Sequence, residues 1–398
     1  MYITASKLYD FTQCPHRVWR DVYGPQEEKI KETNPFIQLL WDRGVLHEEK
    51  IIRNIGEYLD LSEGGLDERF KKTIDAMKNK APLIYQGVLQ NRNLLGIPDL
   101  IKRLPDGNYI PLDIKSGMGF EEMEAESGEE GKPKKHYAVQ LCLYIDLLGQ
   151  LGFEHLNKGI IIDIQGNNVE YDLSRPVGKK NLTSLWEYYE EVKRNVALLL
   201  DNNAQNKPSS SGKCKLCPWF KSCKNWVIET EDLTGLFYVG ASKRDVINED
   251  LGIQRISQII GLDTEQALRM KKKNKSLLKG VGRDTLEKIQ KRAEVLIKTR
   301  KPVLYDDLEL PEVSYELYFN IENDPTQEFV YLHGVYEISR NGSDYKHFLA
   351  PEISKEAERR AWQKFWDYIH SLPRDDYAVY YFSSHEKTIY KRIQKQYP

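Results

Sequence analysis

The chain contains Leu95-Gly96-Ile97-Pro98-Asp99-Leu100-Ile101 and, after a Pro105-Asp106-Gly107-Asn108 turn, Tyr109-Ile110-Pro111-Leu112-Asp113-Ile114-Lys115-Ser116-Gly117. Two strand-like stretches separated by such a turn predict a β-hairpin. Successive side chains of a strand point to opposite faces, so Asp113 and Lys115 share one face while Leu112 and Ile114 share the other. We expect Asp99, on the neighbouring strand, to approach the first face.

Two carboxylates beside a lysine are suited to metal-assisted hydrolysis. Asp99 and Asp113 can hold a hard divalent cation such as Mg²⁺, which prefers oxygen ligands and keeps several waters. The metal generates hydroxide from bound water, and Lys115 orients that water or neutralises a developing phosphorane. Alternating charge on an exposed strand is more often only solvated surface, so the tripeptide alone leaves both interpretations open.

The segment before the hairpin, from Phe36 to Leu59, has helical periodicity. One side of this predicted helix carries a stripe of five residues, Ile37, Leu40, Gly44, His47 and Ile51. Gly44 removes bulk one turn before His47, so we expect this histidine to reach the two carboxylates as a further metal ligand. A packed or surface histidine is the alternative.

A second helix is predicted after the hairpin, from Tyr137 to Leu148. Gln140 and Tyr144 share one face of it at a spacing of four residues. They are expected to orient Lys115 or to bind the scissile strand, and ordinary helix-surface positions are the alternative.

Five cysteines in 398 residues are an odd and low number, which argues against a secreted disulfide framework. Three form a Cys-x₂-Cys-x₅-Cys cluster at Cys214, Cys217 and Cys223, and Cys14 stands alone near the start. Cys142 lies in an apolar run and is expected to fill a core.

Composition predicts a soluble, modular, cytoplasmic protein. The length suggests two or three domains, and the formal charge of −2 means that any nucleic-acid surface must come from local patches. No apolar run approaches the ~20 residues needed to cross a bilayer, so no membrane association is expected. The acidic segment 116–135 is expected to be a mobile surface loop.

The motifs Gly44-x-x-His47, Pro98-Asp99, Asp113-Ile114-Lys115 and Gln140-x-x-x-Tyr144 together resemble the RecB-like branch of the PD-(D/E)XK nuclease superfamily. The resemblance implies Mg²⁺ or Mn²⁺ at a site that includes His47, Asp99, Asp113 and Ile114. It implies catalytic roles for Asp99, Asp113, Lys115, Gln140 and Tyr144.

One cysteine before this core and three after it are similar to the arrangement in iron–sulfur RecB-like nucleases, such as the CRISPR-associated and AddB-type enzymes. That resemblance implies a [4Fe–4S] cluster held by Cys14, Cys214, Cys217 and Cys223. A four-thiolate zinc site is the alternative, because the ligands alone do not separate the two.

The module order resembles bacterial RecB-like nucleases with a C-terminal RNase H-like domain. We therefore expect an α/β multidomain chain. Its parts are a restriction-endonuclease-like core with a mixed sheet flanked by helices (1–228), a helix-hairpin-helix DNA-binding region (229–302) and a partial RNase H-like α/β module (303–398).

In the middle region, the Gly280-Val281-Gly282 turn is expected to offer backbone N–H groups to a phosphate. Lys271, Lys272 and Lys273 would add salt-sensitive attraction to DNA. A plain helical linker is the alternative.

In the last region, the pattern of a two-metal exonuclease fails. Asn320 stands where the resemblance implies an aspartate, two residues before Glu322, and Glu386 corresponds to a second motif. An amide supplies one carbonyl in place of a carboxylate, which weakens two-metal binding. We expect a truncated or non-catalytic module, with Asn320 either natural or an engineered inactivation.

The expected function is a metal-dependent DNA nuclease, with an exonuclease on single-stranded or end-bearing DNA as the form that the resemblance implies, in repair, recombination or defence. Possible partners are a helicase and a recombination or CRISPR protein. The alternatives are a non-cleaving DNA-binding scaffold subunit and an RNA-processing nuclease.

Overall fold

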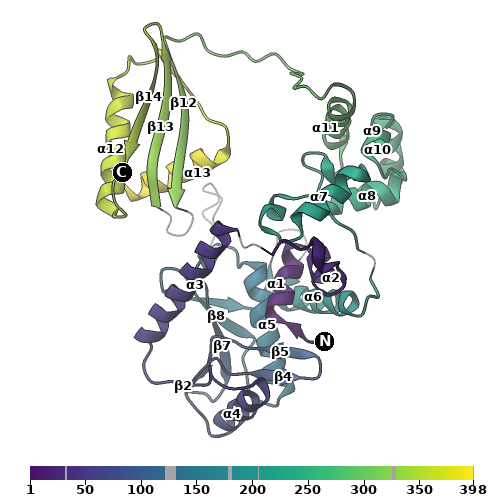
Figure 1. The fold of residues 1–398 in the computed structure, drawn as a ribbon, viewed down its shortest axis with the longest axis vertical. Helices are drawn as coiled ribbons and strands as arrows, with labels where there is room; N and C mark the ends of the chain where they lie inside the picture. Colours follow the sequence, from purple (N-terminus) through teal and green to yellow (C-terminus); the bar gives the residue numbers. More distant parts are fainter. Residues whose placement is uncertain (32–33, 122–130, 178–181, 205, 325–328, 398) are drawn as a thin grey trace. The chain divides into compact units, whose positions relative to one another are not determined.

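The structure, a computed structural model, describes residues 1–31, 34–121, 131–177, 182–204, 206–324 and 329–397. The chain forms two compact units (Figure 1), of which the larger comprises Met1–Glu121 with Lys132–Leu304 and the smaller begins at Tyr305. Residues 122–130 of the acidic segment, predicted to be a mobile loop, lie outside the described residues.

A six-stranded mixed sheet organises the larger unit, with strand order β2-β3-β6-β7-β8-β9. The strands are Leu59–Asp60 (β2), Leu83–Tyr85 (β3), Leu100–Arg103 (β6), Tyr109–Ile114 (β7), Lys158–Ile162 (β8) and Asn168–Asp172 (β9). The central strand β7 pairs antiparallel with β6 and parallel with β8, and all six of its residues are buried.

The predicted hairpin is confirmed as β6 and β7, which are paired from Leu100 opposite Leu112 to Arg103 opposite Tyr109. Its turn is closed by Asp106, whose Oδ1 accepts a hydrogen bond from the Asn108 amide at 3.0 Å, and by Gly107 at φ +98°. Only glycine adopts that φ without strain, so the turn residues fix the pairing register.

Helices cover both faces of this sheet. On one face, α3 (Pro35–Asn54) packs Ile52 against Leu112 and Ile114 of β7. On the other face, α5 (Lys135–Gln150) lies across β7 and β8 and buries ten of its side chains. The helix α3 ends five residues earlier than the predicted Leu59, because the chain reaches Gly56 and then enters β2.

The remaining elements of this part surround α5. The helices α1 and α6 pack on it, and a small sheet has the order β1-β5-β4. The bounds are Ile3–Thr4 (β1), Ala5–Gln13 (α1), Pro15–Tyr23 (α2), Gln26–Glu28 (η1), Leu66–Lys78 (α4), Leu89–Asn91 (β4), Leu94–Gly96 (β5), Pro176–Val177 (β10), Thr183–Ser184 (β11), Leu185–Leu200 (α6), Gly212–Leu216 (η2) and Phe220–Glu229 (α7). Cys142 of α5 is fully buried in this core, as predicted.

A helical region with its own apolar core follows. Its elements are Leu233–Gly235 (η3), Ala241–Leu251 (α8), Ile256–Ile259 (α9), Thr264–Lys273 (α10), Arg283–Glu294 (α11) and Val295–Thr299 (η4). Buried Arg244 joins it to the preceding part of the chain, because its guanidinium donates to the Pro208 carbonyl at 2.5 Å. The same guanidinium lies 3.6 Å from Asp232 within the helical region.

The smaller unit is a four-stranded sheet of order β14-β13-β12-β15. Its elements are Tyr315–Asp324 (β12), Phe329–Ser339 (β13), Gly342–Leu349 (β14), Lys355–Ser371 (α12), Tyr377–Tyr380 (β15) and Ser384–Gln396 (α13). Both helices contribute to the core on one face, through Phe365 of α12 and Ile393 of α13. The succession of strand, strand, strand, helix and strand is the one predicted, whereas the RNase H-like assignment stays a prediction.

The opposite face of this sheet carries a row of tyrosines. Cross-strand pairing places Tyr345, Tyr336, Tyr318 and Tyr380 side by side on β14, β13, β12 and β15. The rings of Tyr318 and Tyr380 lie 5.2 Å apart.

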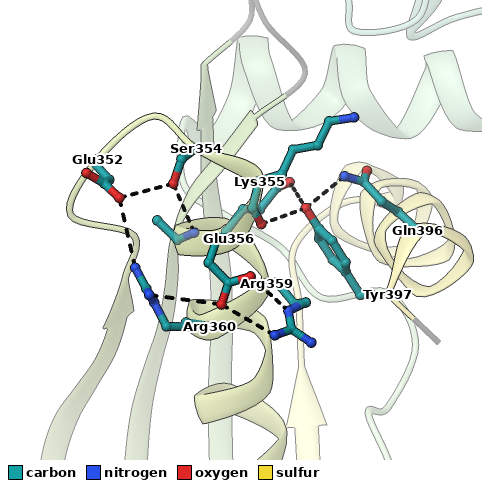
Figure 2. Close-up of polar contacts among 10 residues, drawn as sticks. Glu352, Ser354, Lys355, Glu356, Arg359, Arg360, Gln396 and Tyr397 are labelled. Atoms are coloured by element: carbon teal, nitrogen blue, oxygen red, sulfur yellow. Dashed lines mark hydrogen bonds and ion pairs between the residues drawn. The ribbon is translucent and has the colours of Figure 1, made fainter.

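Polar contacts fix the start of α12 against the end of α13 (Figure 2). The hydroxyl of Ser354 accepts from the Ala357 amide at 3.1 Å, which caps the helix, and the hydroxyl of Tyr397 donates to the Lys355 carbonyl at 3.0 Å. No helix in the described part of the chain is both long and apolar enough to cross a membrane.

Candidate active site

Asp113 and Lys115 lie at the end of β7, on the face that α5 covers. The Lys115 ammonium is 2.7 Å from Asp113 Oδ2 and donates to Gln140 Oε1 at 3.2 Å. Asp113 is only 2% exposed. The alternation along β7 therefore sends this pair to the polar end of a buried strand, whereas Leu112 and Ile114 enter the core beneath α3.

Asp99 directly precedes β6 and reaches the same end of the sheet. Its Oδ2 accepts from the Ile114 amide at 2.7 Å, and its Oδ1 accepts from Gln86 Nε2 at 3.2 Å. The same amide of Gln86 donates to Glu48 Oε1 at 3.3 Å. Glu48, which the sequence analysis did not identify, thus adds a third carboxylate beside Asp99.

The charges at this site are strongly coupled. Burial, then Asp113 and Glu48, raise the pKa of Asp99 well above its usual value, against the opposing influence of Lys115. Burial alone would lower the pKa of Lys115, but Asp113 and Asp99 raise it overall. A further cation at this site would favour the ionised form of Asp99, as Lys115 already does.

His47 lies on the buried side of α3, as predicted, at 7% exposure. Its Nε2 is 2.9 Å from the backbone carbonyl of Asp163, which follows β8. This contact orients the imidazole with one ring nitrogen and leaves the other for a further partner.

Gln140 and Tyr144 are both buried on α5 and are not surface residues. Gln140 contacts Lys115, whereas the Tyr144 hydroxyl is 3.5 Å from the carbonyl of Ile97. A Cβ on Gly96 would lie 2.7 Å from Tyr144 Cδ1, so the ring requires this glycine. Tyr144 therefore positions the segment that leads to Asp99 and does not itself contact Lys115.

The donor set fits a hard divalent cation. Asp113 Oδ2 is buried and accepts no well-directed hydrogen bond, although the ammonium of Lys115 is close to it. Oxygen ligands from Asp99, Asp113 and Glu48, with the free nitrogen of His47, are of the type that Mg²⁺ or Mn²⁺ takes. Among the described residues, no three His, Cys, Asp or Glu side chains are gathered closely enough to hold a metal ion as they stand.

Four cysteines line a separate cavity of about 210 Å³ in the same domain. They come from the junction of α1 and α2, from η2 and from α7, and are Cys14, Cys214, Cys217 and Cys223. All four are free thiols of intermediate exposure. Residues that are far apart in the sequence are thus brought to one place.

Several basic side chains line this cavity. Arg17, Arg20 and Lys213 line it, together with His16 and no described carboxylate. The Nε atoms of both arginines and Nε2 of His16 are buried without a hydrogen-bond partner. His16 Nδ1 donates to the Asn206 carbonyl oxygen, so its Nε2 is an acceptor. The guanidiniums of Arg17 and Arg20 form ion pairs with Asp10 and Glu28, and their buried Nε–H groups are the donors that an anionic group in the cavity would satisfy.

Burial raises the pKa of the Cys14 and Cys217 thiols and raises that of Cys223 to about 11. These thiols are therefore neutral at physiological pH unless a metal replaces their protons, and metal binding would release protons.

In the helical region, Gly282 is the N-cap of α11, Gly280 has φ +74° and Val281 is fully buried between them. Lys271 does not extend into solvent, because its ammonium donates to the carbonyls of Leu278 and Val281 at 2.9 and 2.7 Å. It holds the turn together, and only Lys272 and Lys273 of the three predicted lysines are exposed.

In the smaller unit, Asn320 and Glu322 lie on the exposed face of β12, where the Asn320 amide donates to Glu322 Oε1 at 3.1 Å. Glu386 is buried and accepts at 2.9 Å from Ser383, the N-cap of α13. Glu386 therefore has a helix-capping contact, and the structure brings no further carboxylate to Asn320 among the contacts described.

A model of the PD-(D/E)XK nuclease superfamily matches residues 14–224, which is more than half of the chain. The matched segment begins at Cys14, ends just after Cys223 and includes the whole site around Asp99, Asp113 and Lys115. No curated protein and no solved structure matches the chain. Nucleases of this superfamily usually use Mg²⁺ or Mn²⁺, which agrees with the oxygen-rich donor set. The chain belongs to the PD-(D/E)XK nuclease superfamily.

Proposed function

We propose that the protein is a metal-dependent deoxyribonuclease that hydrolyses phosphodiesters at the end of β7. The observation that carries the proposal is the coupled cluster of Asp99, Asp113 and Lys115 within a PD-(D/E)XK domain. Single-stranded or end-bearing DNA is the proposed substrate, and a helicase or recombination protein is the proposed partner.

Each side chain has a role in this proposal. Asp99 and Asp113, supported by Glu48 and His47, would hold the divalent ion, which would activate water for attack and neutralise phosphate charge. Gln140 holds the Lys115 ammonium near Asp113, where it orients the attacking water. Tyr144 positions the backbone before Asp99.

We further propose that the four cysteines hold a [4Fe–4S] cluster that fastens α1 and α2 to α7. The support is the shared cavity and the buried Nε–H groups of Arg17 and Arg20 in its lining, which suit the negative charge of a thiolate-bound cluster. Anaerobic purification tests this proposal: a brown protein with about four irons per chain is expected. A colourless, zinc-loaded protein would replace the cluster with a structural zinc site.

Residues 229–302 are proposed as a helix-hairpin-helix DNA-binding region, and the last module as a non-catalytic RNase H-like domain. The two exposed lysines of α10 and the glycines before α11 support the first proposal. The exposed amide at Asn320 supports the second.

The deciding experiment compares Lys115→Ala with Lys193→Ala. Each lysine side chain is 22% exposed and pairs with an aspartate, at 2.7 Å for Asp113 and 2.8 Å for Asp146. Lys115→Ala should lower Mg²⁺- or Mn²⁺-dependent DNA cleavage by about 10³-fold, and Lys193→Ala should leave it near the parent rate. Equal rates for the two variants would reject the site. Cleavage of RNA in preference to DNA would make the enzyme a ribonuclease.

A further inference from the structure

Two turns of the helical region repeat the same pattern. The first reads Leu236-Phe237-Tyr238-Val239-Gly240 and the second reads Leu278-Lys279-Gly280-Val281-Gly282. In each turn the leucine and the valine are buried, and the last glycine is the N-cap of the next helix, α8 or α11. In each turn the valine amide donates to the leucine carbonyl, at 3.1 and 2.9 Å.

The third position differs between the turns. Gly280 adopts φ +74° without strain, but Tyr238 adopts φ +67° with a full side chain. An aromatic residue in this region of φ is an outlier, which costs about 1–3 kcal/mol and is maintained mostly where a site requires it. Glycine would adopt this φ without strain, so the tyrosine ring is kept at a cost to folding.

The first turn exposes two adjacent rings. Phe237 and Tyr238 are each 70% exposed, with centroids 4.5 Å apart at an interplanar angle of 64°. The equivalent residues of the second turn, Lys279 and Gly280, carry no ring. The aromatic pair is therefore an addition to the repeat and not a requirement of its core.

Two cations are fixed beside these rings. The Arg292 guanidinium lies 4.9 Å from the Tyr238 centroid and donates to the Phe237 carbonyl at 2.9 Å. The Lys243 ammonium donates to the Tyr238 carbonyl at 3.3 Å. Exposed rings flanked by cations are complementary to an unpaired nucleotide, because its base stacks and its phosphate is anionic.

We propose that Phe237 and Tyr238 form a stacking platform for unpaired DNA bases, with Lys243 and Arg292 beside the flanking phosphates. This inference rests on the proposed function, and it adds how a strand is recognised outside the catalytic site. Stacking tolerates any base, so the platform selects DNA with a single-stranded segment over fully paired DNA, without sequence preference.

The test measures binding of the full chain to a fluorescein-labelled single strand and to the matched duplex, in the Lys115→Ala background so that no DNA is cut. Phe237→Ala combined with Tyr238→Gly should weaken single-strand binding by roughly tenfold or more and change duplex binding less than about twofold. Tyr238→Gly also releases the strained φ, so the thermal stability should stay equal or rise.

Two controls make the result specific. Tyr238→Trp should retain binding because it keeps a stacking ring, and Phe382→Ala removes an exposed ring from the smaller unit without effect. A 2-aminopurine base in the single strand should be quenched by the parent and not by the double variant. Equal losses on single strand and duplex, or no loss, would overturn the platform.

The outcome is distinguishable from failure of the proposed function. If Lys115-dependent cleavage is found and the double variant binds single strands normally, the nuclease stands and the platform is wrong. If the parent neither cleaves nor binds DNA, the nuclease proposal fails first and the platform fails with it.

Discussion

The six-stranded and the four-stranded sheet each carry polar residues two positions apart at one strand, and the two pairs differ in their surroundings. On β7, Asp113 and Lys115 lie against α5 and meet Asp99 from the neighbouring hairpin strand. On β12, Asn320 and Glu322 lie on an open face and contact only each other in the interactions described. Similar spacing thus gives a buried group of interacting side chains at one sheet and two exposed, solvated side chains at the other.

The difference lies in convergence and burial. In the first sheet, a helix excludes water and side chains from β6, β7, α3 and α5 meet, so each charge changes the pKa of its neighbours. In the second sheet, both helices pack on the opposite face, so the charges on the open face remain in water. We therefore expect a carboxylate motif to bind a metal ion only where the fold gathers donors from several elements.

The largest expected effect is the difference in cleavage rate between two variants, each of which neutralises one carboxylate, one beside each sheet. Asp99→Asn should reduce DNA cleavage by about 10³-fold, because a metal ligand and the charge beside Lys115 are lost. Glu322→Gln should leave the rate unchanged. The measurement is the single-turnover rate at saturating metal, and similar losses for the two variants would abolish the distinction between the sheets.

Stability should move in the opposite direction for Asp99→Asn. The folded pKa of Asp99 is raised, so its ionised form costs folding free energy at neutral pH, and an amide removes that cost. Urea unfolding should show equal or higher stability for the variant.

The second effect concerns the buried side of the smaller sheet. Burial among aromatic rings lowers the pKa of His333 to about 4. The histidine is therefore neutral in the folded protein. The free energy of unfolding does not depend on this group above its unfolded pKa of about 6.5, and it decreases as the pH falls from 6.5 toward 4. The loss should reach about 3 kcal/mol at the lower end.

This loss can be measured by urea unfolding at several pH values, with pulse hydrogen exchange reporting on peptides of β13 and α12. His333→Phe should remove the acid dependence between pH 6.5 and pH 4 that the peptides of β13 and α12 report, whatever its effect on stability at pH 7. An unchanged slope would show that another group is responsible.

The third effect is the pH dependence of cleavage. Because the pKa of Asp99 is raised, the rate should fall tenfold per pH unit on an acid limb that lies above the ordinary range of an aspartate. Higher metal concentration should move the limb to lower pH, since the ion competes with the proton. An acid limb near pH 4 that does not shift with metal concentration would contradict the raised pKa that burial and Asp113 give to Asp99.

The smallest expected effect concerns the smaller sheet, where a new carboxylate should not increase cleavage. Asn320→Asp restores a carboxylate beside Glu322 but recruits no donor from another element, so metal-dependent cleavage should stay within about twofold of the parent. The assay uses the Lys115→Ala background, in which new activity would be visible. Any restored cleavage would show that the smaller sheet holds a second catalytic site.

Much of the nuclease core could be predicted from local sequence. The hairpin turn at Asp106 and Gly107, the alternation of Asp113 and Lys115, and the helical stripe that includes His47 are short-range patterns with a direct geometric meaning. Their convergence could be expected only through the family resemblance, because it depends on pairing between β6, β7 and β8.

Other contacts left no local signal. Glu48 follows His47 by one residue and so falls off the helical stripe, and Gln86 reaches Asp99 from a turn after β3. Lys271 looked like a DNA-binding cation, because its contacts with two carbonyls across the turn are visible only in three dimensions. The same holds for Arg17 and Arg20 in the cysteine cavity.

The cysteine cavity also affects when the domain can finish folding. The Trp219 indole donates to Asp21 at 3.0 Å, and these residues are 198 positions apart in the chain. Trp219 lines the same cavity as Cys14 and Cys223. Such contacts close a very long loop, which slows folding because the entropy is lost before the contact forms. During synthesis, α1 and α2 must therefore wait for almost the whole domain to emerge before they gain their last partners.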